Sequence, residues 1–100
     1  MKIIKIGNVV YRIKRIKRLI DGGDVLFGQI NYKKSTIKLT KRMSNQHERQ
    51  TIWHEAIHAI AHQTGAKIDE QLVEILASGI MQVINDNPEI GKKVTDGPTD

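Results

Sequence analysis

The sequence predicts an α+β fold, in which a small antiparallel β-sheet of about three strands is followed by two or three helices. Short alternations of apolar and polar residues, separated by turn-forming residues, run through the first forty positions and indicate strands. From Ser44 onward the apolar residues recur at helical spacing instead. One hundred residues, of which 39% are hydrophobic and none is cysteine, suffice for one domain with a modest core and no disulfide framework.

Three strands are expected before residue 41. VVYRIKRI (9–16) mixes β-branched and basic residues without one clean alternation, which indicates a bulge or a change of face near Lys14. Asp21-Gly22-Gly23-Asp24 is a strong turn signal. VLFGQINY (25–32) and TIKLT (36–40) alternate more regularly and complete an antiparallel sheet.

Two helices follow the predicted sheet. Ser44 is a suitable N-cap for the first helix, and Gly65 is suited to end it in a left-handed conformation. The second helix begins near Asp69, another N-cap candidate, and ends at the helix-breaking pair Asn87-Pro88.

The chain is expected to form a single domain over residues 1–87, followed by a polar, flexible tail over residues 88–100. No stretch approaches the roughly 18 uninterrupted apolar residues that a membrane span needs. Lys or Arg interrupts the apolar residues of the N-terminus every two or three positions, so the apolar region of a signal peptide is absent. These features predict a cytoplasmic protein with no membrane partner.

Charge is distributed unevenly along the chain. Residues 1–49 contain 13 Lys and Arg against 3 Asp and Glu, whereas residues 50–100 contain 3 against 8. A basic half can form an electrostatic footprint for nucleic acid. The alternative, which the sequence favours, is a solvated strand face whose lysines also protect a sheet edge from unwanted pairing.

The first predicted helix carries an H-E-x-x-H motif formed by His54, Glu55 and His58. Two histidines four residues apart project from one face of a helix, and both can reach one Zn²⁺ ion at about 2.1 Å. Glu55 is rotated by about 100° from His54, which places its carboxylate beside the metal, where it can act as a general base. The surrounding residues are strongly hydrophobic, and buried imidazoles and carboxylates are costly without a partner such as a metal ion.

A catalytic zinc site has three protein ligands and an open position. His47 and His62 are excluded as the third ligand, because each residue of a helix adds about 1.5 Å along the axis and places them too far away. Since the chain has no cysteine, the third ligand should be a carboxylate of the second helix: Asp69, Glu70 or Glu74. Glu70 and Glu74 lie one turn apart on the same face, so helix geometry alone does not distinguish them.

TIWHEAIHAIAHQ (51–63), followed by EQLVEILASGIMQVI (70–84), resembles the ImmA/IrrE type of zinc metallopeptidase, particularly its short versions in phages and integrated elements. The resemblance covers roughly residues 8–87. The second helix of that family carries a ligand glutamate in the pattern E-x-x-A-N-x-F-A, which falls here on Glu70, while Val73 and Glu74 depart from the pattern. The resemblance therefore implies a minimal zincin-like domain with Glu70 as the third zinc ligand.

The same resemblance implies a substrate and a way of binding it. TIKLT would be the edge strand of the sheet and would pair with an extended peptide above the zinc by β-augmentation. Family members act on helix-turn-helix repressors of mobile elements or stress regulons. Larger members carry additional domains that this chain lacks, so little surface is left for selecting a target.

The sequence thus predicts a zinc-dependent metallo-endopeptidase that hydrolyses a peptide bond in a protein substrate, such as a repressor of a mobile element. His54, His58 and Glu70 are the predicted Zn²⁺ ligands, and Glu55 is the predicted catalytic residue. The alternative function is a non-catalytic, zinc-containing regulatory or DNA-associated binding module that uses the basic N-terminal half.

A peptidase of this kind usually has a second group that stabilises the developing oxyanion. Tyr11, Tyr32 and His62 are the candidates that the sequence offers for this role.

Overall fold

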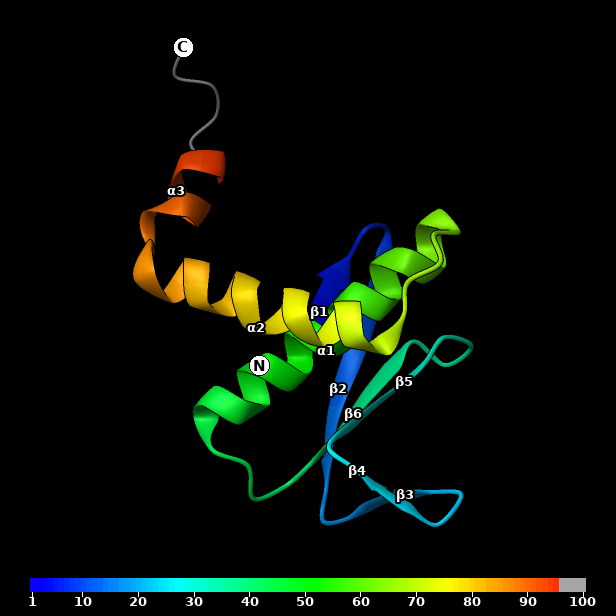
Figure 1. The fold of residues 1–100 in the computed structure, drawn as a ribbon. Coiled ribbons are helices and arrows are strands. Elements are labelled where there is room, and N and C mark those ends of the chain that lie inside the picture. The colour runs from blue at the N-terminus through cyan, green and yellow to red at the C-terminus, as the bar shows by residue number, and fades with distance from the viewer. Residues whose placement is uncertain (96–100) are drawn as a thin grey trace.

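The computed structural model describes residues 1–95 and has an α+β fold (Figure 1). The elements, in chain order, are β1 (Ile3–Ile6), β2 (Val9–Ile16), β3 (Leu19–Asp21), β4 (Asp24–Leu26), β5 (Gly28–Asn31), β6 (Thr36–Thr40), α1 (Asn45–Thr64), α2 (Glu70–Asp86) and α3 (Glu89–Thr95). Helix α1 lies against one face of the main sheet, and α2 crosses over α1. The α+β class predicted from the sequence is confirmed.

The main sheet has the strand order β1-β2-β6-β5 and is mixed. β1 and β2 form an antiparallel hairpin in which Ile6 pairs with Val9 across a two-residue turn. Gly7 has a φ of 60° in this turn, a conformation that type II′ hairpin turns require at their first central position. β2 and β6 run parallel, and β5 then pairs antiparallel with β6.

β6 occupies the interior of the sheet because it is the most completely buried strand. Ile37 and Leu39 both have no exposed surface, and they lie beside Ile13 and Arg15 of β2. β5 contributes Gly28 and Gln29 in place of large apolar residues and lies at the edge. The expectation that TIKLT forms an edge strand is therefore wrong.

The predicted sheet of about three antiparallel strands also needs correction. The sequence 25–32 forms two strands, β4 and β5, which belong to different sheets on either side of Phe27. β1 was not expected, because its apolar residues are interrupted by lysine. The bulge expected near Lys14 is absent, since the pairing of β2 with β6 is continuous from Arg12 to Ile16.

β3 and β4 form a separate two-stranded hairpin. Gly22 and Gly23 in its turn have φ values of 59° and 88°, as a two-residue turn of type I′ requires. The turn predicted at Asp21–Asp24 is confirmed.

The predicted helix caps are confirmed as well. Ser44 accepts a hydrogen bond from the backbone N–H of His47 (3.0 Å), and Asp69 accepts one from Leu72 (2.8 Å). Gly65 ends α1 in the left-handed conformation, with a φ of 73°. These caps fix where α1 ends and α2 begins.

The hydrophobic core is divided between two contacts of α1. Toward the sheet, Ala56 and Ala59 of α1 pack on apolar residues of β1, β2 and β6: Ile6, Tyr11, Ile13, Ile37 and Leu39. Toward α2, Ile57 packs against Val73 and Ala77, which have no exposed surface. Helix α1 is thus held from both sides, which fixes the orientation of the side chains along it.

A third helix follows α2. Pro88 precedes α3, and proline at the start of a helix supplies a suitable φ without losing a hydrogen bond. The predicted polar tail (88–100) therefore begins with a helix, and residues 96–100 lie outside the described residues. Within residues 1–95, no helix combines the length and the apolar character that a membrane crossing needs.

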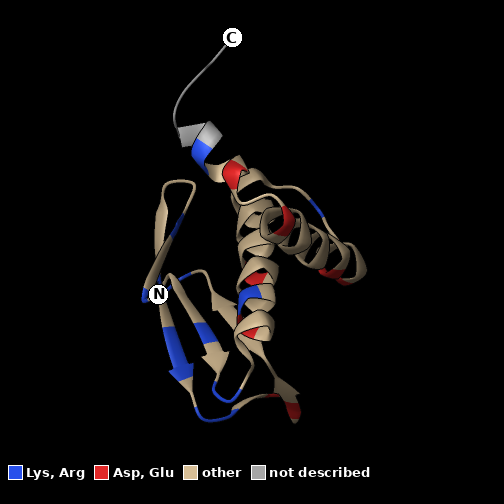
Figure 2. Cartoon of the chain, turned by 90° about the vertical axis from the view of Figure 1, so that its left-hand side faces the viewer, with Lys and Arg blue, Asp and Glu red and all other residues tan. Residues whose placement is uncertain are grey.

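Charge is divided between the layers of the fold. Figure 2 shows Lys and Arg concentrated on the strands and loops of the sheet, with most of the Asp and Glu on the helical side. One ion pair joins the two layers: the Arg15 guanidinium on β2 donates to both carboxylate oxygens of Glu48 on α1, at 3.0 and 2.8 Å. These hydrogen bonds lower the pKa of Glu48 and raise that of Arg15.

β5 approaches α1 closely at Gly28. A Cβ atom at this position would lie 2.6 Å from Cγ2 of Thr51 and 3.1 Å from Oε2 of Glu55. Thr51 cannot easily move away, since it is buried and its hydroxyl donates to the carbonyl of His47 (2.9 Å). Glycine is therefore required here for strand and helix to meet.

Replacing Gly28 by alanine should lower the free energy of unfolding by about 1–3 kcal/mol, the usual cost of overpacking. Urea denaturation of the metal-free protein measures this change. Gly79→Ala is the matched control, because its added methyl group meets no atom within 4 Å and the change should stabilise α2 by about 0.5–1 kcal/mol. Equal or greater stability of the Gly28→Ala variant would contradict the close approach.

Candidate metal centre

The two histidines of the motif project from the same side of α1. Their rings have centroids 5.0 Å apart and are tilted by 58°. The side chains of His54 and His58 are 16% and 22% exposed, so both are largely buried while remaining open to solvent at one edge. This arrangement follows from their spacing of four residues on a helix that is fixed on two sides.

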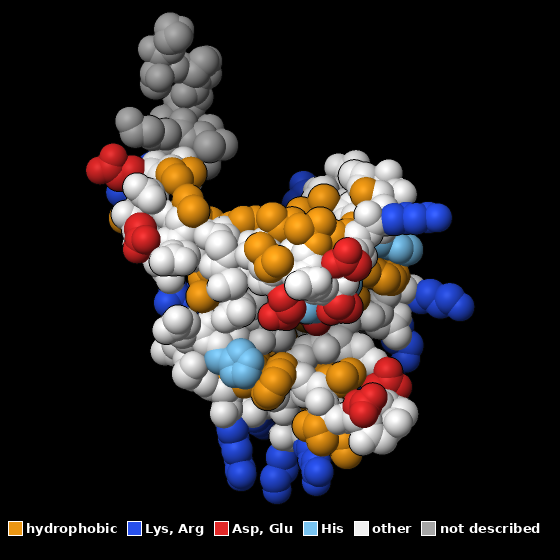
Figure 3. Space-filling model, in the orientation of Figure 1, with side chains coloured by type: hydrophobic (Ala, Val, Ile, Leu, Met, Phe, Trp, Pro, Cys, Tyr) orange, Lys and Arg blue, Asp and Glu red, His pale blue; other side chains and the backbone are white. Residues whose placement is uncertain are grey.

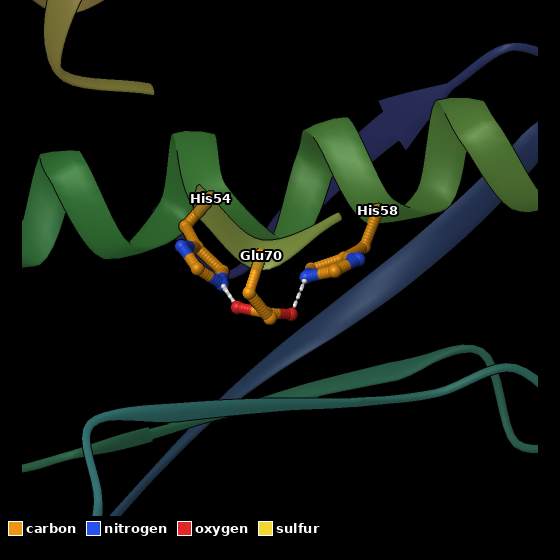
Figure 4. A group of neighbouring side chains, drawn as sticks. All are labelled: His54, His58 and Glu70. Atoms are coloured by element: carbon orange, nitrogen blue, oxygen red, sulfur yellow. Dashed lines mark ion pairs between the residues drawn. The ribbon is translucent and has the colours of Figure 1, made fainter. Parts of the chain in front are cut away.

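Glu70 completes a three-residue cluster with these histidines (Figure 4). It is the first residue of α2, and the connection from Gly65 to Asp69 returns the chain so that this residue faces the histidine side of α1. Its Oε2 lies 3.1 Å from Nε2 of His54, and its Oε1 lies 2.6 Å from Nε2 of His58. The Glu70 carboxylate thus contacts Nε2 of both histidine rings, with one oxygen to each ring.

The cluster has the donor set of a catalytic zinc site. Two imidazole nitrogens and one carboxylate oxygen, with a fourth position open, are a known ligand set for catalytic zinc. One ligand atom of each of the three residues lies within 4.8 Å of the others, and the Glu70 side chain is 70% exposed, which leaves access from solvent. The residues present therefore fit a zinc ion.

Glu74 lies one turn further along α2 and contacts the opposite side of the His54 ring. Its Oε1 is 2.5 Å from Nδ1 of His54, although the geometry of the pair is not that of a hydrogen bond, and Nδ1 is buried without another partner. A carboxylate beside the non-ligating nitrogen of a metal-binding histidine fixes its orientation and tautomer. Glu70 thus belongs to the three-residue cluster, whereas Glu74 lies outside it, beside the other ring nitrogen of His54.

The other carboxylate considered for this role is used elsewhere. Asp69 caps α2 through its hydrogen bond to the backbone of Leu72. Its side chain is committed to the helix end rather than to the histidines.

Glu55 lies on the side of α1 that faces β5. It is only 6% exposed, and Gly28 allows the backbone of β5 to pass close to its carboxylate. Burial raises the pKa of Glu55, the positive charge of His54 and His58 when protonated lowers it, and the carboxylates of Glu70 and Glu74 raise it again. The net direction is upward, because removal of a carboxylate from water is the largest effect.

A groove of about 370 Å³ opens beside Glu55. Its walls are a segment of β4 and β5 on one side and α1 with Glu74 on the other: Val25, Leu26, Phe27, Gly28, His47, Gln50, Thr51, His54, Glu55 and Glu74. Figure 3 shows acidic side chains gathered around a histidine on this face of the molecule. A ligand in this groove would contact Glu55 and His54 together.

Of the ten residues that line the groove, only His54 and Glu55 were predicted as site residues. His47 lies seven residues before His54, two helical turns away on the same face, a spacing from which its position could have been inferred. The ring of Phe27 packs on that of His47, with centroids 4.5 Å apart. Gln50, which also lines the groove, lies between His47 and His54 in the sequence. Nothing local in the sequence places Phe27 there, because its position depends on the break between β4 and β5.

The three residues considered as a second electrophile do not line this groove. Tyr11 is 2% exposed and belongs to the core. Tyr32 stacks on His62, with ring centroids 3.8 Å apart and planes 7° apart, at a separate hollow of about 600 Å³. That larger hollow shares no lining residue with the histidine and glutamate cluster.

Comparison with known proteins found no relative of this chain. No protein-family model matches the chain, and neither a curated protein nor a solved structure matches it.

The two glutamates of α2 should differ when zinc binding is measured. We expect one zinc per chain in the wild type and in Glu74→Ala, but no retained zinc in Glu70→Ala. Loss of an outer carboxylate typically weakens metal affinity by about 10–100-fold, so Glu74→Ala should lose zinc at lower chelator concentrations than the wild type. Elemental analysis after dialysis against graded chelator gives both quantities.

Glu89→Ala on α3 serves as the control for removal of an exposed glutamate, and it should match the wild type. Zinc retained by Glu70→Ala but lost from Glu74→Ala would reverse the assignment of the two residues. Absence of zinc from the wild type after supplementation would exclude the centre.

Proposed function

We propose that this protein is a zinc-dependent metallo-endopeptidase that hydrolyses a peptide bond within a protein substrate. The observation that carries the proposal is the contact of the Glu70 carboxylate with Nε2 of both His54 and His58, beside the buried Glu55. His54, His58 and Glu70 would hold the metal, and Glu55 would act as the general base.

Zinc held by these residues would supply a Lewis acid that polarises the scissile carbonyl and activates water as a nucleophile. Glu55 would accept the proton of the attacking water on its carboxylate and then deliver it to the nitrogen of the leaving amine. Its raised pKa suits both transfers, because a base works best when its pKa lies closer to the working pH. Glu74 would hold His54 in the orientation that directs Nε2 toward Glu70.

The free edge of β5 supports binding of an extended peptide. β5 is the last strand of the sheet, and its first residue, Gly28, lines the groove beside Glu55. A peptide that adds to this edge by β-augmentation would pass along the groove. We therefore assign to β5 the substrate-pairing role that the sequence had suggested for TIKLT.

The resemblance of residues 51–63 and 70–84 to ImmA/IrrE metallopeptidases supports a choice of substrate. On this basis we propose a helix-turn-helix repressor of a mobile element as the protein that is cut. An enzyme with such a substrate would act in the cytoplasm, where the repressor binds DNA.

Glu55→Gln should abolish peptidase activity while one zinc per chain is retained. Loss of a general base typically lowers the rate by about 10²–10⁴-fold, whereas the three ligands are unchanged by this substitution. Cleavage of dye-quenched casein and of a mixed peptide library, followed by mass spectrometry, measures the activity.

Glu89→Gln removes the charge of an exposed glutamate on α3 and should leave both activity and zinc content unchanged. Equal cleavage by the wild type and Glu55→Gln, or cleavage that persists after the zinc is removed by chelation, would sink the proposed mechanism.

A further inference from the structure

The face of the main sheet that points away from α1 is not covered by any described element. Residues of each strand alternate between the two faces, and the inward residues form the core with α1. The strand register places the outward residues side by side: Ile3, Lys5, Val10, Arg12, Lys14, Ile16, Gln29, Asn31, Thr36, Lys38 and Thr40. Thr36 is buried among them, and its hydroxyl donates to the carbonyl of Lys34. We call this surface the outer sheet face.

The outer sheet face carries four positive charges and no negative one among these positions. Lys5, Arg12, Lys14 and Lys38 are all exposed, and none of the four forms an ion pair within residues 1–92. Figure 2 shows Lys and Arg along the strands of the sheet. Asp21 accepts a hydrogen bond from Gln29 at the β5 edge (3.2 Å), which brings one carboxylate to the margin of the face.

Two of these positive charges lie directly next to each other. Lys14 of β2 and Lys38 of β6 are partners in the parallel pairing, so their side chains emerge next to each other. Like charges in this position are unfavourable unless an anion lies between them. On the inner face, by contrast, Arg15 is neutralised by Glu48.

We propose that the outer sheet face binds the phosphate backbone of double-stranded DNA. Lys, Arg and Asn side chains are among those that position proteins on phosphates, and the exposed polar residues of the face are of these types: Lys5, Arg12, Lys14, Asn31 and Lys38. A protein partner fits less well, because protein interfaces are depleted of lysine and enriched in aromatic residues at their centre.

The positions of the aromatic residues favour duplex over single-stranded nucleic acid. Proteins that bind single strands stack the bases on aromatic side chains. The four aromatic residues of the chain lie elsewhere: Tyr11 in the core, Phe27 on His47, Tyr32 on His62 and Trp53 between α1 and α2. The proposed DNA site is also separate from the proposed metal centre. Glu55, Glu70 and Glu74 lie there, on the helical side of the sheet, and would repel phosphates.

Fluorescence anisotropy of a labelled 24-base-pair duplex, titrated with the full chain at 50 and 200 mM salt, tests the proposal. Four phosphate contacts give a slope of about −3.6 for log affinity against log salt, which is a loss of about 150-fold over this range. Lys14→Gln/Lys38→Gln should bind more weakly at 50 mM salt and lose only about 12-fold, since two contacts remain.

Arg49→Gln/Lys67→Gln is the matched control, because it removes the same charge from α1 and the α1–α2 connection and should keep the wild-type slope. Circular dichroism verifies that each variant is folded. The proposal is overturned if the duplex does not bind at 50 mM salt, or if the control weakens binding as much as the outer-face variant. Displacement of the duplex by an equal charge concentration of polyglutamate would also overturn it, in favour of an acidic protein partner.

Discussion

Three carboxylates converge on two imidazole rings, and α1, α2 and β5 have to be placed around this cluster. Glu70 contacts both His54 and His58, Glu74 contacts the far nitrogen of His54, and Glu55 is buried beside them. Negative charges held this close repel one another, so the arrangement favours a cation between them. It also requires α2 to begin above the motif, which the Asp69 cap and the packing of Val73 and Ala77 on Ile57 achieve.

One face of the main sheet packs on α1, which carries the two histidines, and the other face is exposed. Gly28 lets β5 pass close to Thr51 and Glu55, so that the strand edge, the buried Glu55 carboxylate and the groove lie together. The opposite face carries the unpaired positive charges of β1, β2 and β6. A peptidase that is held on DNA through that face would meet DNA-bound repressors at high local concentration, which connects the two proposals without making either depend on the other.

Much of the helical half could be predicted because its signals are local. The caps at Ser44, Gly65 and Asp69 and the helical placement of the H-E-x-x-H motif follow from neighbouring residues, and the structure confirms each of them. The choice between Glu70 and Glu74 could not be made from helix periodicity, since both lie on one face of α2. It depends on how α2 is placed over α1, which is a matter of tertiary packing.

The sheet was harder to predict for the same physical reason. Alternation identifies strands but not their order, and the parallel pairing of β2 with β6 joins segments that are more than twenty residues apart. Burial of Ile37 and Leu39 decides that β6 lies inside and β5 at the edge, and no local pattern encodes that competition. The groove residue Phe27 was missed because the break that positions it falls within an apparently continuous strand.

X-ray absorption at the zinc edge shows whether His54, His58 and Glu70 bind zinc with one coordination position left open. We expect two imidazole nitrogens at about 2.0–2.1 Å and oxygen ligands at about 2.0–2.2 Å, one of which is replaced when a hydroxamate is added. A zinc environment closed by four protein ligands, or one that does not respond to the hydroxamate, would contradict the proposed centre.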